Sequence, residues 1–138
     1  MNSLGRRSRE RGQTLVLTAL LLVALVAILA LVIDGGNYYL QRRVAQNAAD
    51  SGALAGARAL AMGEDEAAAR AAASGYAGAN GDSAPSVSIV GHTVTVTAHR
   101  TFPSFFAGIV GIRTFSVQAV ASAEYGFPKT LGNLCRWP

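Results

Sequence analysis

The sequence has few of the residues from which catalytic and metal-binding sites are usually built. Only 14% of its 138 residues are charged, and it contains two histidines and a single cysteine, Cys135. One cysteine excludes an intrachain disulfide and a zinc site made of several thiolates. The low charge and the 51% hydrophobic content exclude a disordered, solvating polypeptide. A chain of this length is expected to form one domain at most.

Catalytic motifs are also missing. No carboxylate or cysteine stands at metal-ligand spacing around His92 or His99. The sequence has no nucleophile elbow, no H-E-x-x-H pair and no phosphate-binding G-x-x-x-x-G-K-[ST] loop. Asp34 and Asn37 are interpreted as polar residues that end an apolar helix. We therefore predict a protein that is not an enzyme and that has no cofactor and no metal site.

The net positive charge comes mainly from the first residues. Residues 1–12 hold four arginines against one glutamate, namely Arg6, Arg7, Arg9 and Arg11 against Glu10. They supply +3 of the formal net charge of +4, which leaves about +1 for the rest of the chain. A basic flank without a basic domain predicts no nucleic-acid binding.

One long apolar run follows this flank. From Leu15 to Ile33 only Thr18 is polar and no residue is charged. A helix of these 19 residues is about 28 Å long, close to the roughly 30 Å hydrocarbon core of a bilayer. We predict a transmembrane helix over residues 14–34, preceded by a basic cytoplasmic flank over residues 1–13. Because cationic flanks resist transfer across the membrane, the remainder of the chain is expected to lie outside.

Two other interpretations of the run are a buried core helix and a removable secretory signal. A chain of this length has little other mass with which to surround the run on all sides. Secretory signals usually have an apolar stretch of about 7–15 residues that ends at a small-x-small site. This run is longer and ends in Asp34-Gly35-Gly36, and a segment with good helix propensity follows it. These features favour an uncleaved anchor.

Residues 35–80 are predicted to be an Ala/Gly-rich helical region. The segment 37–62 continues the anchor, with a weak point at Gly35-Gly36, and Gly63 is expected to terminate it. A second helix is predicted from Glu64 to about Ala79.

Small residues form one face of this region. They recur at spacings of three and four and are Ala45, Ala48, Ala49, Gly52, Ala53, Gly56 and Ala57. Another backbone can approach such a face closely. Two interpretations are open: the face packs on the chain's own domain, or it is a helix–helix assembly surface.

The hydrophobic period changes to two after a loop at residues 78–85. A small antiparallel sheet is predicted within residues 85–125, with strands over 86–90, 93–98 and 114–123. Its expected buried residues are Val87, Ile89, Val94, Val96, Phe115 and Val117. A short helix is expected to start at Pro103 and end at Gly111, and to cover the sheet with Phe102, Phe105, Phe106 and Ile109. Residues 126–138, which include Cys135 and Trp137, are predicted to form an irregular tail.

Motifs on both sides of the apolar run follow a recognisable order. They are Arg11-Gly12-Gln13 before it, Asp34-Gly35-Gly36 and Arg42-Arg43 after it, and then Gln46-Asn47-Ala48-Ala49-Asp50 and Gly52-Ala53-Leu54-Ala55-Gly56-Ala57. This order resembles TadE/TadG-like Flp pilus-assembly proteins, densely over residues 6–60 and weakly over residues 94–97, 105–106, 111–112 and 117–123. The motif residues are Arg6, Arg7, Arg9, Arg11, Gly12, Asp34, Asn47 and Asp50.

The resemblance implies a membrane-anchored structural or assembly component of a Tad/Flp-type pilus, similar to a minor pilin or pseudopilin. It implies a pilin-like α+β fold: a long N-terminal helix, a short second helix and a sheet of about three strands. The implied partners are membrane lipid, other pilus subunits or Tad assembly proteins, and further copies of the chain. The implied location is the bacterial cytoplasmic membrane or a surface pilus. The alternative is a major filament subunit whose apolar helices form the filament core.

The sequence departs from these relatives at two points. Longer TadG-like proteins carry a von Willebrand factor A-type domain, whose D-x-S-x-S metal signature is missing here, so a short form without metal-dependent adhesion is expected. Pilins carry glutamate at the fifth position after the leader-peptidase site, which would be Leu17 if cleavage followed the pattern at Gly12. Leader removal is therefore not carried over from the family.

Overall fold

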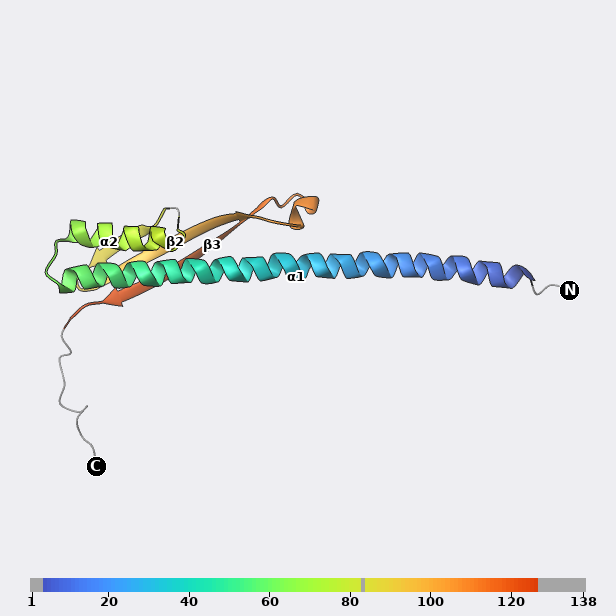
Figure 1. Ribbon diagram of the computed structural model, residues 1–138, viewed down its shortest axis with the longest axis horizontal. Coiled ribbons are helices and arrows are strands. Elements are labelled where there is room, and N and C mark those ends of the chain that lie inside the picture. Colours follow the sequence, from blue (N-terminus) through green and yellow to red (C-terminus); the bar gives the residue numbers. More distant parts are fainter. Residues whose placement is uncertain (1–3, 83, 127–138) are drawn as a thin grey trace, which may run out of the picture. The chain divides into compact units, whose positions relative to one another are not determined.

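The computed structural model describes residues 4–82 and 84–126, with side chains from Gly12 onward. The elements are α1 (Leu4–Ala61), α2 (Glu66–Ala79), β1 (Ser86–Val90), β2 (Thr93–Pro103), a 3₁₀ helix η1 (Ala107–Val110) and β3 (Thr114–Glu124) (Figure 1). The strands form one antiparallel sheet in the order β1-β2-β3. The predicted α+β class is confirmed. Of the expected tail at residues 126–138, all but Gly126 lies outside the described residues, including Cys135 and Trp137.

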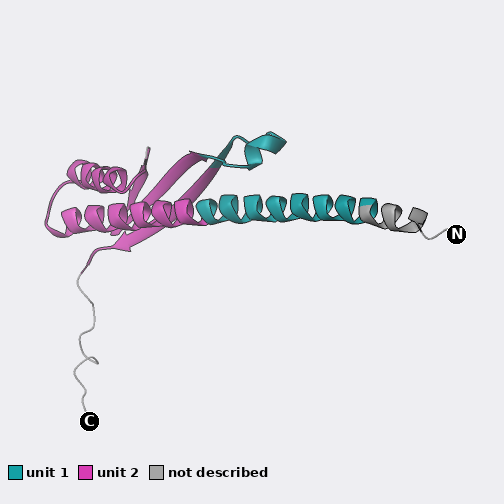
Figure 2. Cartoon of the chain, turned by 45° about the vertical axis from the view of Figure 1, so that its right-hand side comes forward, with its two compact units in different colours: residues 1–38, 103–115 teal, residues 39–102, 116–138 magenta. Residues whose placement is uncertain are grey.

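The chain divides into two compact units (Figure 2). Unit 1 comprises residues 1–38 and 103–115, and unit 2 comprises residues 39–102 and 116–138. Unit 1 holds the apolar part of α1 and the segment around η1. Unit 2 holds the second part of α1, together with α2, β1 and most of β2 and β3.

The helix α1 is continuous through Gly35-Gly36, so the expected weak point does not interrupt it. It ends at Ala61, and Gly63 follows with a φ of +87°, which favours glycine. The Gly63 N–H donates to the Leu60 carbonyl over 3.0 Å, and the Glu64 N–H donates to the Ala59 carbonyl over 3.1 Å. These bonds form a Schellman motif, which satisfies carbonyls that the helix end leaves unpaired.

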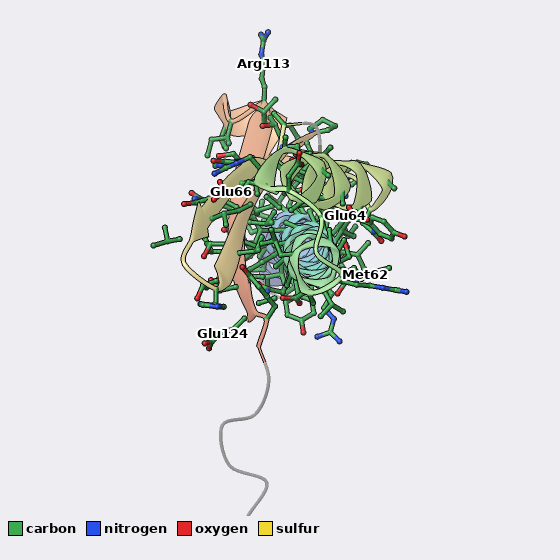
Figure 3. The ribbon with its side chains drawn as sticks, turned by 90° about the vertical axis from the view of Figure 1, so that its left-hand side faces the viewer. Met62, Glu64, Glu66, Arg113 and Glu124 are labelled. Atoms are coloured by element: carbon green, nitrogen blue, oxygen red, sulfur yellow. The ribbon has the colours of Figure 1, made fainter. Side chains whose placement is uncertain are left out.

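The helix α2 begins two residues later than the sequence predicts. Asp65 is its N-cap, and the Asp65 side chain accepts a hydrogen bond of 2.8 Å from the Ala68 N–H. Figure 3 shows Met62 and Glu64 in the turn before the helix and Glu66 at its start. Arg70 pairs with Glu66 at 3.5 Å and donates to the Val87 carbonyl over 2.7 Å, which ties α2 to β1.

The core of unit 2 is built from small residues of two helices and valines of the hairpin. It consists of Ala53, Ala57, Ala73, Ala77, Val94 and Val96. The predicted hairpin turns at Gly91-His92 and pairs Ile89 with Val94 and Val87 with Val96. Val94, Val96 and Val117 are buried, whereas Val87, Ile89 and Phe115 are only half-buried.

The segment between β2 and β3 differs from the prediction. β2 continues through Pro103, and η1 begins only at Ala107, so the expected helix start at Pro103 is wrong. Proline is tolerated at the end of a strand because no ladder bond is required of its nitrogen there. Gly111 ends the short helix with a φ of +92°, as expected.

The aromatic and aliphatic residues of this segment do not cover the sheet as expected. Phe102 alone is buried, whereas Phe105 is 65% exposed, Ile109 is 86% exposed and Phe106 is also exposed. The sequence shows that these residues are apolar, but it does not show which way their side chains point in a segment with only one short 3₁₀ helix.

Candidate functional site

The small-residue face of α1 lies inside unit 2. Ala45, Ala48 and Ala49 are fully buried. A Cβ atom built on Gly52 would lie 2.9 Å from the Ala73 carbonyl oxygen, and one built on Gly56 would lie 2.9 Å from a methyl group of Val94. Both glycines therefore allow α1 to approach α2 and β2 of the same chain.

The polar residues of the same motif lie on the other side of α1. Asn47 and Asp50 are exposed, and the Gln46 side-chain amide donates to Asp50 over 3.0 Å. Arg42 and Arg43 are exposed as well. The motif thus separates into a buried small face and an exposed polar face, which is the pattern of a helix packed on one side only.

The apolar run of α1 is a second surface, and it belongs to unit 1. One helix among the described residues is long and apolar enough to cross a membrane, and its most apolar window has no buried share. Leu15, Leu31 and Val32 are 72%, 74% and 63% exposed. The single polar side chain, Thr18, donates to the Thr14 carbonyl over 2.8 Å, so its hydroxyl is paired within the helix.

Asp34, the residue that ends the run, binds a segment far away in the sequence. Its carboxylate accepts three successive backbone N–H groups, from Phe105 at 2.9 Å, Phe106 at 3.1 Å and Ala107 at 2.7 Å. The side chain is 7% exposed. An ionised carboxylate is an acceptor only, so all its hydrogen bonds here come from N–H donors. We call this arrangement the Asp34 clamp.

The segment that the clamp holds also makes hydrogen bonds within itself and to the residue that follows it. We call residues 104–112 the η1 loop. The Ser104 N–H donates to the Arg113 carbonyl over 3.0 Å, and the Ser104 hydroxyl donates to the Ile112 carbonyl. The Ile112 N–H returns to the Ala107 carbonyl over 3.0 Å. These bonds lie within the η1 loop or at its base, and the exposed side chains of the loop are apolar.

An apolar groove of about 800 Å³ separates the η1 loop from α1 within unit 1. On the helix side it is lined by residues that include Val23, Val26 and Ala30, and on the loop side by Ile109 and Val110. At its end the ring of Tyr38 meets that of Phe115 edge-on, with centroids 6.2 Å apart.

The structure thus separates the predicted motif residues into different environments. Arg6, Arg7, Arg9 and Arg11 lie in α1, but their side chains are outside the described part. Gly12 has open space around it. The carboxylates Asp34 and Asp50 are not brought together. Among the described residues, no group of three or more His, Cys, Asp and Glu side chains could hold a metal ion.

Sequence reasoning missed the role of Asp34. The sequence pattern indicates only the polar end of a helix, whereas the partners of Asp34 lie 71 to 73 residues further along the chain. Such a pairing leaves no local pattern, since backbone N–H groups carry no side-chain signature. The available signal was a single carboxylate placed directly after an uncharged run.

Comparison with known families agrees with the sequence motifs. Residues 12–59 match the family described as putative Flp pilus-assembly TadE/G-like. The matched stretch covers the apolar run, Asp34 and the small-residue face, and it ends before α2. No curated protein and no solved structure matches the chain. The predicted resemblance is confirmed for this segment, and it supports a structural, pilus-related role.

Proposed function

We propose that this chain, whose residues 12–59 are TadE/G-like, is a membrane-anchored structural or assembly component of a Tad/Flp-type pilus. The apolar run of α1 would cross the cytoplasmic membrane once. The arginine-rich flank would remain in the cytoplasm, and unit 2 would lie outside.

One observation carries this proposal: the small residues that follow the run are buried in unit 2, whereas no residue in the most apolar window of the run is buried. Because unit 2 has its own core, it does not need the run for packing. A run of this length and exposure requires lipid or other apolar helices around it.

The partners expected on this basis are membrane lipid, other pilus subunits or Tad assembly proteins, and further copies of the chain. Lipid would surround the run while the protein is in the membrane. The exposed polar face around Asn47 and Asp50 is available to protein partners outside it.

A major filament subunit is the second candidate, because the exposed apolar run would also suit the core of a filament. Fractionation separates the two functions. Cells are sheared, and the chain is quantified in the released filaments and in the membrane. An assembly component remains mainly with the membrane, and its deletion abolishes piliation. A major subunit would form the bulk of the sheared filaments. Unchanged piliation after deletion would contradict both functions.

The same fractions answer the processing question. Intact mass and amino-terminal sequencing show whether residues 1–12 are present. We expect the flank to be retained, because Leu17 stands where the pilin pattern has glutamate. A new amino terminus at or next to Gly12 would contradict this expectation.

A further inference from the structure

We propose that the η1 loop is inserted into the membrane beside the span, so that its exposed side chains contact phospholipid acyl chains. This inference rests on the proposed membrane anchor and goes beyond it. It assigns lipid contact to a segment of the chain that is separated from the span by about seventy residues.

The depth of the loop follows from the helix residues that it faces. Ile109 and Val110 line the same groove as Val23 and Val26. Val23 precedes Asp34 by 11 residues, which corresponds to about 16 Å along a helix. This distance is about half of the roughly 30 Å hydrocarbon core. If the apolar run crosses the bilayer, the loop therefore lies alongside its second half.

Most backbone N–H groups of the loop have acceptors within the protein, as this location requires. Hydrocarbon offers no partners to backbone N–H groups, so non-helical backbone at membrane depth must be satisfied by the protein. The Asp34 clamp takes the N–H groups of Phe105, Phe106 and Ala107. Internal carbonyls take those of Ile109, Gly111 and Ile112. In water these bonds would not be required, whereas in lipid each missing bond is costly.

The exterior of the loop is suited to acyl chains. Residues 101–112 include no charged residue. Ile109 is 86% exposed and Val110 is 77% exposed, so the most exposed side chains are aliphatic. They lie next to helix residues that themselves require an apolar environment, so the same lipid would cover both. A protein partner would have to be membrane-embedded to reach this surface.

The base of the loop carries groups typical of the membrane–water boundary. Arg113 follows the loop directly, is exposed, and projects away from the ribbon in Figure 3. A long cationic side chain at this position can reach lipid phosphates while its stem stays in an apolar region. Tyr38, one turn after Asp34, is 40% exposed, and tyrosine is enriched at this boundary.

Depth-dependent fluorescence quenching tests the proposal on the full chain. The chain carries Trp137→Phe and one new tryptophan, and it is reconstituted in phosphatidylcholine vesicles with brominated acyl chains. Val110→Trp reports on the loop, Val26→Trp on the span and Ser88→Trp on an exposed position of β1. We expect Val110→Trp to lose fluorescence to an extent similar to Val26→Trp, and Ser88→Trp to retain it.

The outcomes separate the loop from the anchor. If Val26→Trp is quenched but Val110→Trp is not, the loop does not contact lipid although the chain is anchored, and the inference fails alone. This result would be obtained if the loop lay in water, or if a second protein copy covered it and kept the brominated acyl chains away. If Val26→Trp is not quenched, the proposed anchor fails as well. Ile109→Trp should be quenched to the same extent as Val110→Trp. This second variant shows whether a result depends on disruption of the loop by one particular substitution.

Discussion

The carboxylate of Asp34 joins α1 to the η1 loop, two segments that lie about seventy residues apart in the sequence. It replaces the water that three adjacent backbone N–H groups would otherwise bind. An aspartate that only ended the helix would be exposed to solvent, whereas Asp34 is only 7% exposed. The clamp gives that burial a structural cause.

Removal of this carboxylate should release the η1 loop. In Asp34→Ala, the N–H groups of Phe105, Phe106 and Ala107 lose their acceptors, so their hydrogen exchange in detergent micelles should become much faster. Asp50→Ala is the matched control, because Asp50 is exposed and bonds to Gln46 within its own helix. Equal exchange at these three amides in Asp34→Ala and in the unmodified chain would show that the clamp does not hold the loop.

Gly52 tests where the small-residue face packs. In Gly52→Ala the new methyl group would meet the Ala73 carbonyl at 2.9 Å, and we expect unit 2 to lose about 1–3 kcal/mol of stability. Gly75→Ala is the control, since Gly75 in α2 has open space, and alanine there should be neutral or add up to about 1 kcal/mol. Thermal unfolding in micelles measures both. A stable Gly52→Ala chain that fails to assemble pili would instead identify this face as an assembly surface.

At the scale of elements, α1 combines two helices with different surroundings. Its first part presents apolar side chains on every side, and its second part buries only the small-residue face. The spacing of the small residues predicted a face that another backbone can approach, but it left open whether that backbone belongs to the same chain. The exposure of the first part follows from its length and from the small size of the remaining chain.

A charge within the run tests its environment. Val26→Arg should cost about 2.5–3.5 kcal/mol of membrane insertion and reduce the membrane-bound fraction. Val26→Leu keeps the run apolar and should leave that fraction unchanged. Cell fractionation with detection of the intact chain provides the measurement. Undiminished membrane association of Val26→Arg would mean that the run does not cross the hydrocarbon core.

Patterns of neighbouring residues predicted most helices and strands. They did not predict the η1 loop, which depends on hydrogen bonds to a residue far away in the sequence. Alternating residues around Gly91-His92 predicted the hairpin, and Gly63 and Gly111 predicted helix ends, because each depends on a few neighbouring residues. The η1 loop depends on Asp34, whose bonds span more than seventy residues. Because no sequence pattern indicates this pairing, the proline favoured a helix start at Pro103, whereas β2 continues through that residue.

At the scale of the whole molecule, apolar side chains of the described residues form a buried core in unit 2 and an exposed surface in unit 1. Unit 2 buries alanine and valine in a core of its own. Unit 1 leaves apolar side chains exposed on α1 and on the η1 loop. The family match covers the run and the core residues Ala53 and Ala57, so the TadE/G-like segment includes residues of both units.

The membrane topology is the central claim, and thiol labelling tests it most directly. The chain carries Cys135→Ser and Ser88→Cys, an exposed position of β1 in unit 2. Intact spheroplasts are treated with a membrane-impermeant maleimide. We expect full labelling of Ser88→Cys before lysis, because in the proposed topology unit 2 would lie outside the cytoplasmic membrane. Labelling of this cysteine only after lysis would contradict it.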